Sequence, residues 1–126
     1  MIVVDASVLA PALGGDGEDG DAARERLRDE ELAAPEIIDL EVTNVWRHTL
    51  TDERRAALAL ADLVDLPLRR APHLPLLARC WELRHNVTPY DAAYVALAEA
   101  LDVTLVTADR RLSRAAGIRC AVAVLS

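Results

Sequence analysis

The chain contains no lysine and no phenylalanine, and only two of its 126 residues are cysteine. Cys80 and Cys120 stand far apart, without a CxxC pair or a Cys/His spacing typical of zinc, so we expect reduced, structural cysteines. No apolar run approaches the ~18 residues that span a bilayer, and the N-terminus lacks the basic and apolar segments of a signal peptide. These absences predict a cytoplasmic protein with no membrane association.

The composition favours one domain with an aliphatic core. A chain of 126 residues falls within the commonest domain size of roughly 100 to 150 residues, so we predict a single domain over residues 1–126. Hydrophobic residues make up 52% of it, mostly Ala, Leu and Val, and such a surplus leaves apolar surface for a partner or a homodimer. The net charge of −7 disfavours nucleic-acid binding by overall attraction, but it does not exclude a local metal site that binds phosphate.

Short apolar runs alternate with helical patterns along the chain. The runs at residues 2–4, 103–107 and 120–125 predict strands. Helices are predicted at residues 6–13, 21–31, 36–49, 52–65, 75–86, 89–101 and 110–116. The acidic, glycine-rich stretch 14–21 is predicted to be a loop that ends in an Asp N-cap, and its pattern does not match a calcium-binding loop. Strands separated by helices predict an α/β fold with a parallel sheet covered on both faces.

Two aspartates follow predicted strands. Asp5 comes directly after the strand 2–4, and Asp109 follows the strand 103–107 after one residue. If those strands are parallel, both carboxylates emerge at the edge of the sheet where open α/β folds bind ligands. Each residue is equally compatible with simple N-capping of the helix that follows it.

Two further acids lie on apolar helix faces. Glu41 has Ile37 and Val45 at its i−4 and i+4 positions, although a glutamate at the edge of this stripe can also keep its carboxylate in water. Asp91 shares a face with Val95, but it is also three residues after Thr88, which is the spacing of a capping box. An inward carboxylate is costly without a partner or a metal ion.

Several carboxylates in one cleft repel each other unless a cation neutralises them. Oxygen-only ligation points to magnesium or manganese, which bind a few carboxylates together with substrate phosphate. Such an ion lowers the pKa of its bound water and stabilises charge on a phosphodiester. The acids therefore predict metal-dependent phosphodiester hydrolysis.

These segments together resemble the PIN-domain ribonucleases, specifically the VapC-type toxins of bacterial toxin–antitoxin pairs. The resemblance is carried, in order along nearly the whole chain, by the stretches VVDAS, EVTNV, YDAAYVALAEAL and LVTADRRL. It implies a three-layer α/β/α sandwich with a central parallel sheet and an acidic pocket. It also implies magnesium, or alternatively manganese, as cofactor, RNA as substrate and a small antitoxin as inhibitory partner.

The resemblance assigns site roles by position. The catalytic and metal-binding carboxylates would be Asp5, Glu41, Asp91 and Asp109. Residues beside them, placed to position a ligand or the substrate, would be Ser7, Asn44, Thr107 and Arg110, the last in a cluster with Arg111 and Arg114. For Ser7 and Thr107, local hydrogen bonding is an equally good interpretation. The three arginines can equally well be ordinary solvated surface residues.

Competing families fit less well. Response-regulator receivers and haloacid-dehalogenase-like phosphatases also carry aspartates after parallel strands, but both use a lysine, and the phosphatases need an aspartate where Ser7 stands. The chain has no GxxxxGK segment, which excludes a P-loop enzyme. The remaining alternative is a PIN-like domain that binds RNA or protein without cleaving it.

Overall fold

The computed structural model describes residues 1–125. Its strands are β1 (Ile2–Val4), β2 (Leu32–Pro35), β3 (Leu68–Ala71), β4 (Leu105–Thr107) and β5 (Val122–Val124). Its helices are α1 (Ala6–Gly14), α2 (Glu18–Leu27), α3 (Ile38–Thr49), α4 (Glu53–Asp65), the short 3-10 helix η1 (Leu74–Leu76), α5 (Leu77–Glu82), α6 (Pro89–Leu101) and α7 (Arg110–Arg114).

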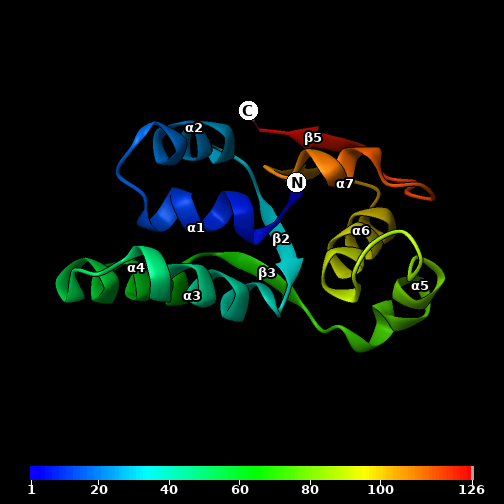
Figure 1. The fold of residues 1–126 in the computed structure, drawn as a ribbon, viewed down its shortest axis with the longest axis horizontal. Helices are drawn as coiled ribbons and strands as arrows, with labels where there is room; N and C mark the ends of the chain where they lie inside the picture. The colour runs from blue at the N-terminus through cyan, green and yellow to red at the C-terminus, as the bar shows by residue number, and fades with distance from the viewer. Residues whose placement is uncertain (126) are drawn as a thin grey trace.

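All five strands are parallel and lie in the order β3-β2-β1-β4-β5. The first strand is thus the centre of the sheet, with β4 beside it although about 100 residues separate the two. In Figure 1, α1 to α4 gather on one side of the strands, and α5 and α6 lie on the other. Helix α6 packs on β1, β2 and β4. The predicted α/β/α architecture with a parallel sheet is confirmed.

The strands β2 and β3 were not predicted. The segment LAAP of β2 contains no β-branched or aromatic residue, and LRRA of β3 places two arginines in the middle of the strand, so neither carries the composition of a typical strand. Both form because they extend the sheet beyond β1, and β2 is buried along its whole length. Tertiary contacts override local propensity here.

The boundaries of several helices differ from the prediction. Helix α2 begins at Glu18 after the N-cap Gly17, so the expected Asp N-cap at residue 21 is wrong and Asp21 lies in the first turn. The predicted helix 75–86 is interrupted, because η1 precedes α5 and α5 ends at Glu82. The cap predicted at Thr88 is confirmed by the bond that its side chain accepts from the backbone N–H of Asp91, and Asp52 caps α4 in the same way.

The core is aliphatic, as the composition predicts. Val3, Val4 and Val95 are completely buried, and Trp46 is almost buried, with its indole N–H donating to the carbonyl of Ala10. Trp81, in contrast, is 68% exposed, so it does not pack in the core. No helix in residues 1–125 is long and apolar enough to cross a membrane.

An ion-pair cluster fixes the C-terminal half of α6. Arg79 on α5 forms two hydrogen bonds with the carboxylate of Glu99, at 2.7 and 3.1 Å, and donates to the carbonyl of Gly117. The backbone N–H of Arg119 donates to Glu99 at 2.8 Å. We call these three charged residues, Arg79, Glu99 and Arg119, the Arg79 cluster. It ties α5, α6 and the segment before β5 together.

Candidate active site

The ends of β1 and β4 place Asp5 and Asp109 at the carboxyl edge of the sheet. The two strands pair in parallel, with Val3 opposite Leu105 and Val4 opposite Val106. Both aspartates also accept bonds from the backbone of the helices that follow them, so the capping interpretation holds for each. Capping and placement at the ligand-binding edge are therefore compatible in this fold.

Both carboxylate oxygens of Asp5 are held by hydroxyl groups. Ser7 donates its hydroxyl and its backbone N–H to Oδ1, and Thr107 donates its hydroxyl to Oδ2. Ser7 in turn accepts from the N–H of Ala108 at 2.9 Å, and Thr107 accepts from the N–H of Asp109 at 3.0 Å. The hydroxyls thus fix Asp5 against the end of β4.

Burial dominates the ionisation of Asp5. The residue is only 7% exposed, and this burial raises the pKa of its carboxyl group above the ordinary value. The bonds from Ser7 and Thr107 lower the pKa in part, and the charge of Asp91 raises it further. No arginine or histidine forms an ion pair with Asp5 among residues 1–125.

Glu41 approaches the edge from α3. It is half-buried, and its Oε1 accepts a hydrogen bond of 2.5 Å from the hydroxyl of Tyr94 on α6. Burial raises the pKa of Glu41, the Tyr94 hydroxyl lowers it in part, and the charges of Asp91 and Asp5 raise it. Glu41 is therefore an inward carboxylate whose neighbours are other acids and one phenol.

Tyr94 is a site residue that the sequence reasoning missed. It is only 2% exposed, and its pKa is raised by burial, by its bond to Glu41 and by the neighbouring carboxylates, so it stays a neutral donor. The available signal was its position three residues after Asp91, which places both side chains on the same side of α6. A tyrosine in an alanine-rich helix had no other distinguishing feature.

Asp91 lies at the N-terminus of α6. Its backbone N–H donates to the Thr88 hydroxyl at 3.2 Å, which confirms the helix start expected there. Burial and the charge of Asp109 raise the pKa of Asp91, whereas Thr88 and Arg111 lower it. The carboxylate is half-buried and belongs to none of the ion pairs within residues 1–125.

Asp109 differs from the other three acids. Its carboxylate accepts two bonds of 3.2 Å from the Arg111 side chain and one of 2.9 Å from the Arg111 backbone. The Arg111 side chain is the main cause of a lowered pKa at Asp109. The residue is near enough to Asp91 to influence its ionisation, yet it already has a cationic partner.

The four carboxylates form one electrostatic unit, which we call the acidic edge: Asp5, Glu41, Asp91 and Asp109. Asp91 raises the pKa of both Asp5 and Glu41, and is itself influenced by Asp109. This set of side chains suits a divalent cation, because every ligand atom that it offers is a carboxylate oxygen. Three of the four residues, Asp5, Glu41 and Asp91, form no ion pair with a cationic side chain within residues 1–125. Within residues 1–125, no three Asp, Glu, His or Cys side chains are arranged as a metal-binding group. The match between these acids and a divalent cation therefore rests on the type of ligand atom and on charge.

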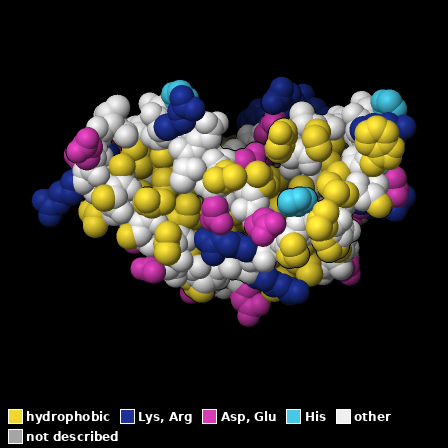
Figure 2. Space-filling model, turned by 90° about the horizontal axis from the view of Figure 1, so that it is seen from below, with side chains coloured by type: hydrophobic (Ala, Val, Ile, Leu, Met, Phe, Trp, Pro, Cys, Tyr) yellow, Lys and Arg dark blue, Asp and Glu magenta, His cyan; other side chains and the backbone are white. Residues whose placement is uncertain are grey.

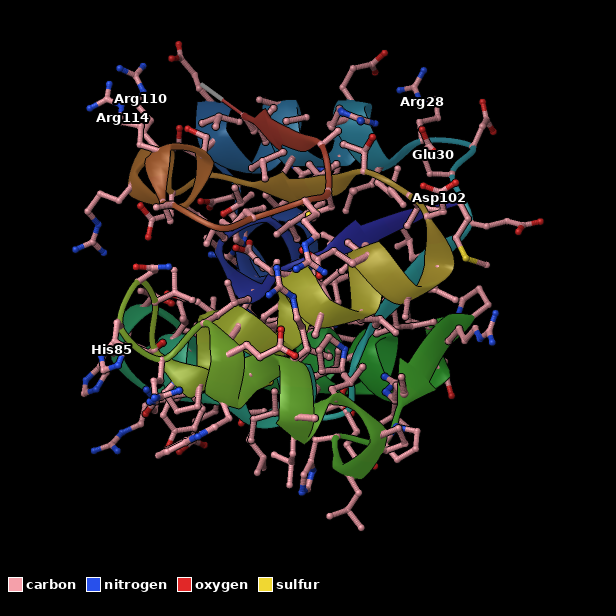
Figure 3. All side chains as sticks on the ribbon, turned by 90° about the vertical axis from the view of Figure 1, so that its right-hand side faces the viewer. Arg28, Glu30, His85, Asp102, Arg110 and Arg114 are labelled. Carbon is pink, nitrogen blue, oxygen red and sulfur yellow. The ribbon has the colours of Figure 1, made fainter. Side chains whose placement is uncertain are left out.

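The other two predicted site residues, Asn44 and Arg110, take no part in the hydrogen bonds that hold the four acids. Asn44 is exposed on α3, and its side chain takes part in none of the hydrogen bonds found within residues 1–125. Arg110 is exposed on α7 and projects from the molecule together with Arg114, as Figure 3 shows. Within residues 1–125, neither side chain forms a hydrogen bond or an ion pair with the four acids.

One cavity in residues 1–125 lies away from these acids. Its volume is about 690 Å³, and its walls are the end of α1, the start of α2, the residues 15–17 between them, and Trp46 and Arg55. A smaller groove of about 480 Å³ includes Asp91 and Asp109 in its walls. Chemistry rather than volume therefore identifies the candidate site.

Comparison with known proteins decides the family. The sequence profile of the PIN domain matches residues 2–118. The chain belongs to the PIN-domain family. It is similar to VapC proteins: ribonuclease VapC1 of Mycobacterium tuberculosis is 46% identical over 128 residues, covering 95% of this chain and 94% of the relative.

Solved structures of other proteins share this PIN fold. The toxin VapC20 of Mycobacterium tuberculosis, described as cleaving the sarcin-ricin loop, superimposes with a TM-score of 0.74 at 19% identity, covering 94% of this chain and 97% of that one. VapBC2 from Rickettsia felis, solved with a DNA fragment from its promoter, gives a TM-score of 0.71 at 16% identity over the whole of both chains. At these identities the likeness concerns the fold.

Proposed function

We propose that this VapC-type PIN domain is a metal-dependent endoribonuclease and the toxin of a toxin–antitoxin pair. The observation that carries the proposal is the acidic edge, where Asp5, Glu41 and Asp91 come from three separate elements and lie inward without cationic partners. The 46% identity to ribonuclease VapC1 supports RNA as the substrate. Ribonucleases of the PIN family generally depend on a divalent metal ion.

We assign the metal as Mg²⁺, with Mn²⁺ as a substitute, because the ligands are hard oxygen donors. Asp5, Glu41, Asp91 and Asp109 would hold it. When bound, such an ion would offset part of the negative charge of the carboxylates, lower the pKa of a water molecule bound to it and stabilise charge on the phosphodiester.

The other residues of the site orient these acids. Ser7 and Thr107 donate three hydrogen bonds to the two oxygens of Asp5, which leaves one of its roughly four acceptor positions, on Oδ2, for a ligand. Tyr94 holds one oxygen of Glu41, so that the other oxygen stays available. Asn44 and Arg110 are assigned to the substrate side, where an amide and a guanidinium contact ribose or phosphate.

An antitoxin and a second copy of the chain are the proposed protein partners, and the proposed location is the cytoplasm. Large hydrophobic side chains are exposed on α3, α4, η1 and α5: Leu40, Val45, Leu58, Leu60, Val64, Leu74, Leu77 and Trp81. Figure 2 shows hydrophobic side chains spread over one face of the molecule, around a central group of acidic and basic ones. This apolar surface supports a homodimer, which light scattering after size exclusion tests: a strict monomer at micromolar concentration contradicts it.

Cleavage of RNA by the purified chain tests the activity. We expect Mg²⁺-dependent cleavage that stops on chelation and in the Asp5→Asn variant. Asp65→Asn serves as a matched control, since Asp65 is an exposed acid at the end of α4. Cleavage that persists in Asp5→Asn and without metal contradicts the proposal.

The alternative is a PIN-like module that binds RNA or protein without cleaving. The same experiment distinguishes it, because a folded chain that binds RNA but leaves it intact with both Mg²⁺ and Mn²⁺ is a binding module. The unpartnered carboxylates favour the enzyme, since a binding surface for RNA gains nothing from buried negative charge.

A further inference from the structure

A groove leads away from the acidic edge along the end of the molecule. Its volume of about 480 Å³ lies within the ~300–1,000 Å³ of small-ligand sites. It begins at Asp91 and Asp109 and continues between α7 and the segment that joins α5 to α6. In Figure 3 this end of the molecule is at the left of the view, where His85 projects below Arg110 and Arg114 of α7.

The groove is formed before any ligand arrives, because its two walls are joined to each other. The side-chain amide of Asn86 donates to the carbonyl of Ala116 at 2.8 Å, which links the α5–α6 segment to the residues after α7. Gly117 has φ +85°, and a Cβ at this position would lie 3.2 Å from the Asn86 amide nitrogen. A glycine therefore permits both the turn and the close approach that closes this end.

Besides its two acids, the groove has Arg111, which is paired with Asp109, and Arg84; its floor is partly apolar. Arg84 and Arg111 lie on opposite walls, and Val87, Leu112 and Ala115 contribute apolar surface. The Arg84 guanidinium stacks over the Trp81 ring at 4.3 Å from its centroid and donates to the Trp81 carbonyl at 2.9 Å. Arg84 belongs to none of the ion pairs within residues 1–125, so its charge is available to a ligand.

We propose that this groove holds the unpaired nucleotide that flanks the scissile phosphate, with its phosphate on Arg84 and its base against the apolar floor. The inference rests on the ribonuclease function proposed above. A phosphodiester at Asp91 and Asp109 has its neighbouring nucleotide within reach of the groove, because these two acids are part of its walls. In a chain of net charge −7, a local cation is needed to hold a phosphate there.

The ligand is single-stranded RNA rather than a duplex. A base enters a groove of this size only when it is unstacked, and unpaired loops and ends present such bases. Arg110 and Arg114 are not part of the groove walls, so Arg84 is the positioning residue that this geometry adds to the site.

Binding of a fluorescein-labelled single-stranded RNA, followed by anisotropy in the Asp5→Asn background to prevent cleavage, tests the assignment. We expect Arg84→Ala to raise the Kd about 5-fold to 10-fold and to reduce the slope of log Kd against log salt by about 0.7, as for one phosphate contact to a single strand. Arg54→Ala, which removes an exposed arginine on α4, is the matched control and should leave both values unchanged.

Two further measurements separate the explanations. Ala115→Phe, which fills the floor without changing charge, should weaken binding by a similar factor, and in the cleaving chain Arg84→Ala should raise KM with little change in kcat. Folding of each variant is checked by thermal melting. If the wild-type chain cleaves RNA but Arg84→Ala and Ala115→Phe bind and cleave like Arg54→Ala, the groove assignment is overturned while the function stands. If no RNA is cleaved by the wild-type chain, the proposed function fails first.

Discussion

The two ends of helix α6 carry carboxylates in opposite situations. Asp91 at the N-terminal end belongs to the acidic edge and has a raised pKa because of burial and the charge of Asp109. Glu99 near the C-terminal end is also largely buried, but the bonds from Arg79 and Arg119 outweigh burial and lower its pKa. Ionised Glu99 thus stabilises the fold, whereas ionised Asp91 destabilises it. This difference distinguishes a structural acid from a functional one.

Exchanging each carboxylate for its amide should give the largest contrast. Asp91→Asn should reduce RNA cleavage at least about 100-fold and leave the free energy of unfolding unchanged or higher, because it removes repulsion. Glu99→Gln should lower the free energy of unfolding by about 2 kcal/mol, since Arg79 loses its partner, and leave the cleavage rate per folded molecule unchanged. Cleavage assays and urea unfolding measure both. A destabilised Asp91→Asn would remove the distinction between the two ends.

Removing one hydroxyl from the support of Asp5 should have the next largest effect. Thr107 is completely buried and donates to Asp5, so Thr107→Val should reduce cleavage by about 10-fold to 100-fold, as substitutions behind a metal ligand do. Thr104→Val is the control, since Thr104 lies just before β4, away from Asp5. Equal rates for the two variants, measured under single-turnover conditions, would show that Asp5 needs no such support.

Metal binding should stabilise only one of the two regions. At a Mg²⁺ concentration of ten times the Kd, binding contributes about 1.4 kcal/mol, which raises the Tm by a few degrees for a chain of this length. The shift should disappear in Asp91→Asn and persist in Glu99→Gln. Differential scanning calorimetry with and without chelator measures it, and a shift retained in Asp91→Asn would place the ion elsewhere.

The pH dependence of stability should have opposite signs at the two ends, with the smallest effects. The lowered pKa of Glu99 means that its contribution is present above the pKa of an unfolded glutamate, about 4.3, and is lost as the pH falls through the folded value. The raised pKa of Asp91 means the reverse: its contribution is present below an unfolded value of about 3.9 and is lost as the pH rises through the folded value.

Unfolding curves of the wild type and of both amide variants between pH 3 and 8 would separate these contributions. The stability difference between wild type and Glu99→Gln should shrink towards low pH. The difference between wild type and Asp91→Asn should instead grow towards high pH, with the variant more stable. Parallel profiles for the two variants would contradict the opposite shifts.

The sequence predicts the acidic edge better than it predicts the sheet. Asp5, Glu41, Asp91 and Asp109 are visible because an acid after a strand or on an apolar helix face conflicts with local burial, and that conflict can be recognised without a structure. The strands β2 and β3 are not visible, since their residues are ordinary for a helix or a loop and only pairing with the centre of the sheet makes them extended. Tyr94 and Arg84 escape prediction for a similar reason, because their partners are known only once α3, α5 and α6 are assembled.

The bond between Thr107 and Asp5 joins residues 102 positions apart in the chain. During synthesis from the N-terminus, Asp5 is made about 100 residues before the strand that fixes it. A nascent chain that ends before β4 lacks both hydroxyl support from Thr107 and the aspartate that follows it. The order of the strands therefore delays assembly of the acidic edge until β4 has been made and has paired with β1.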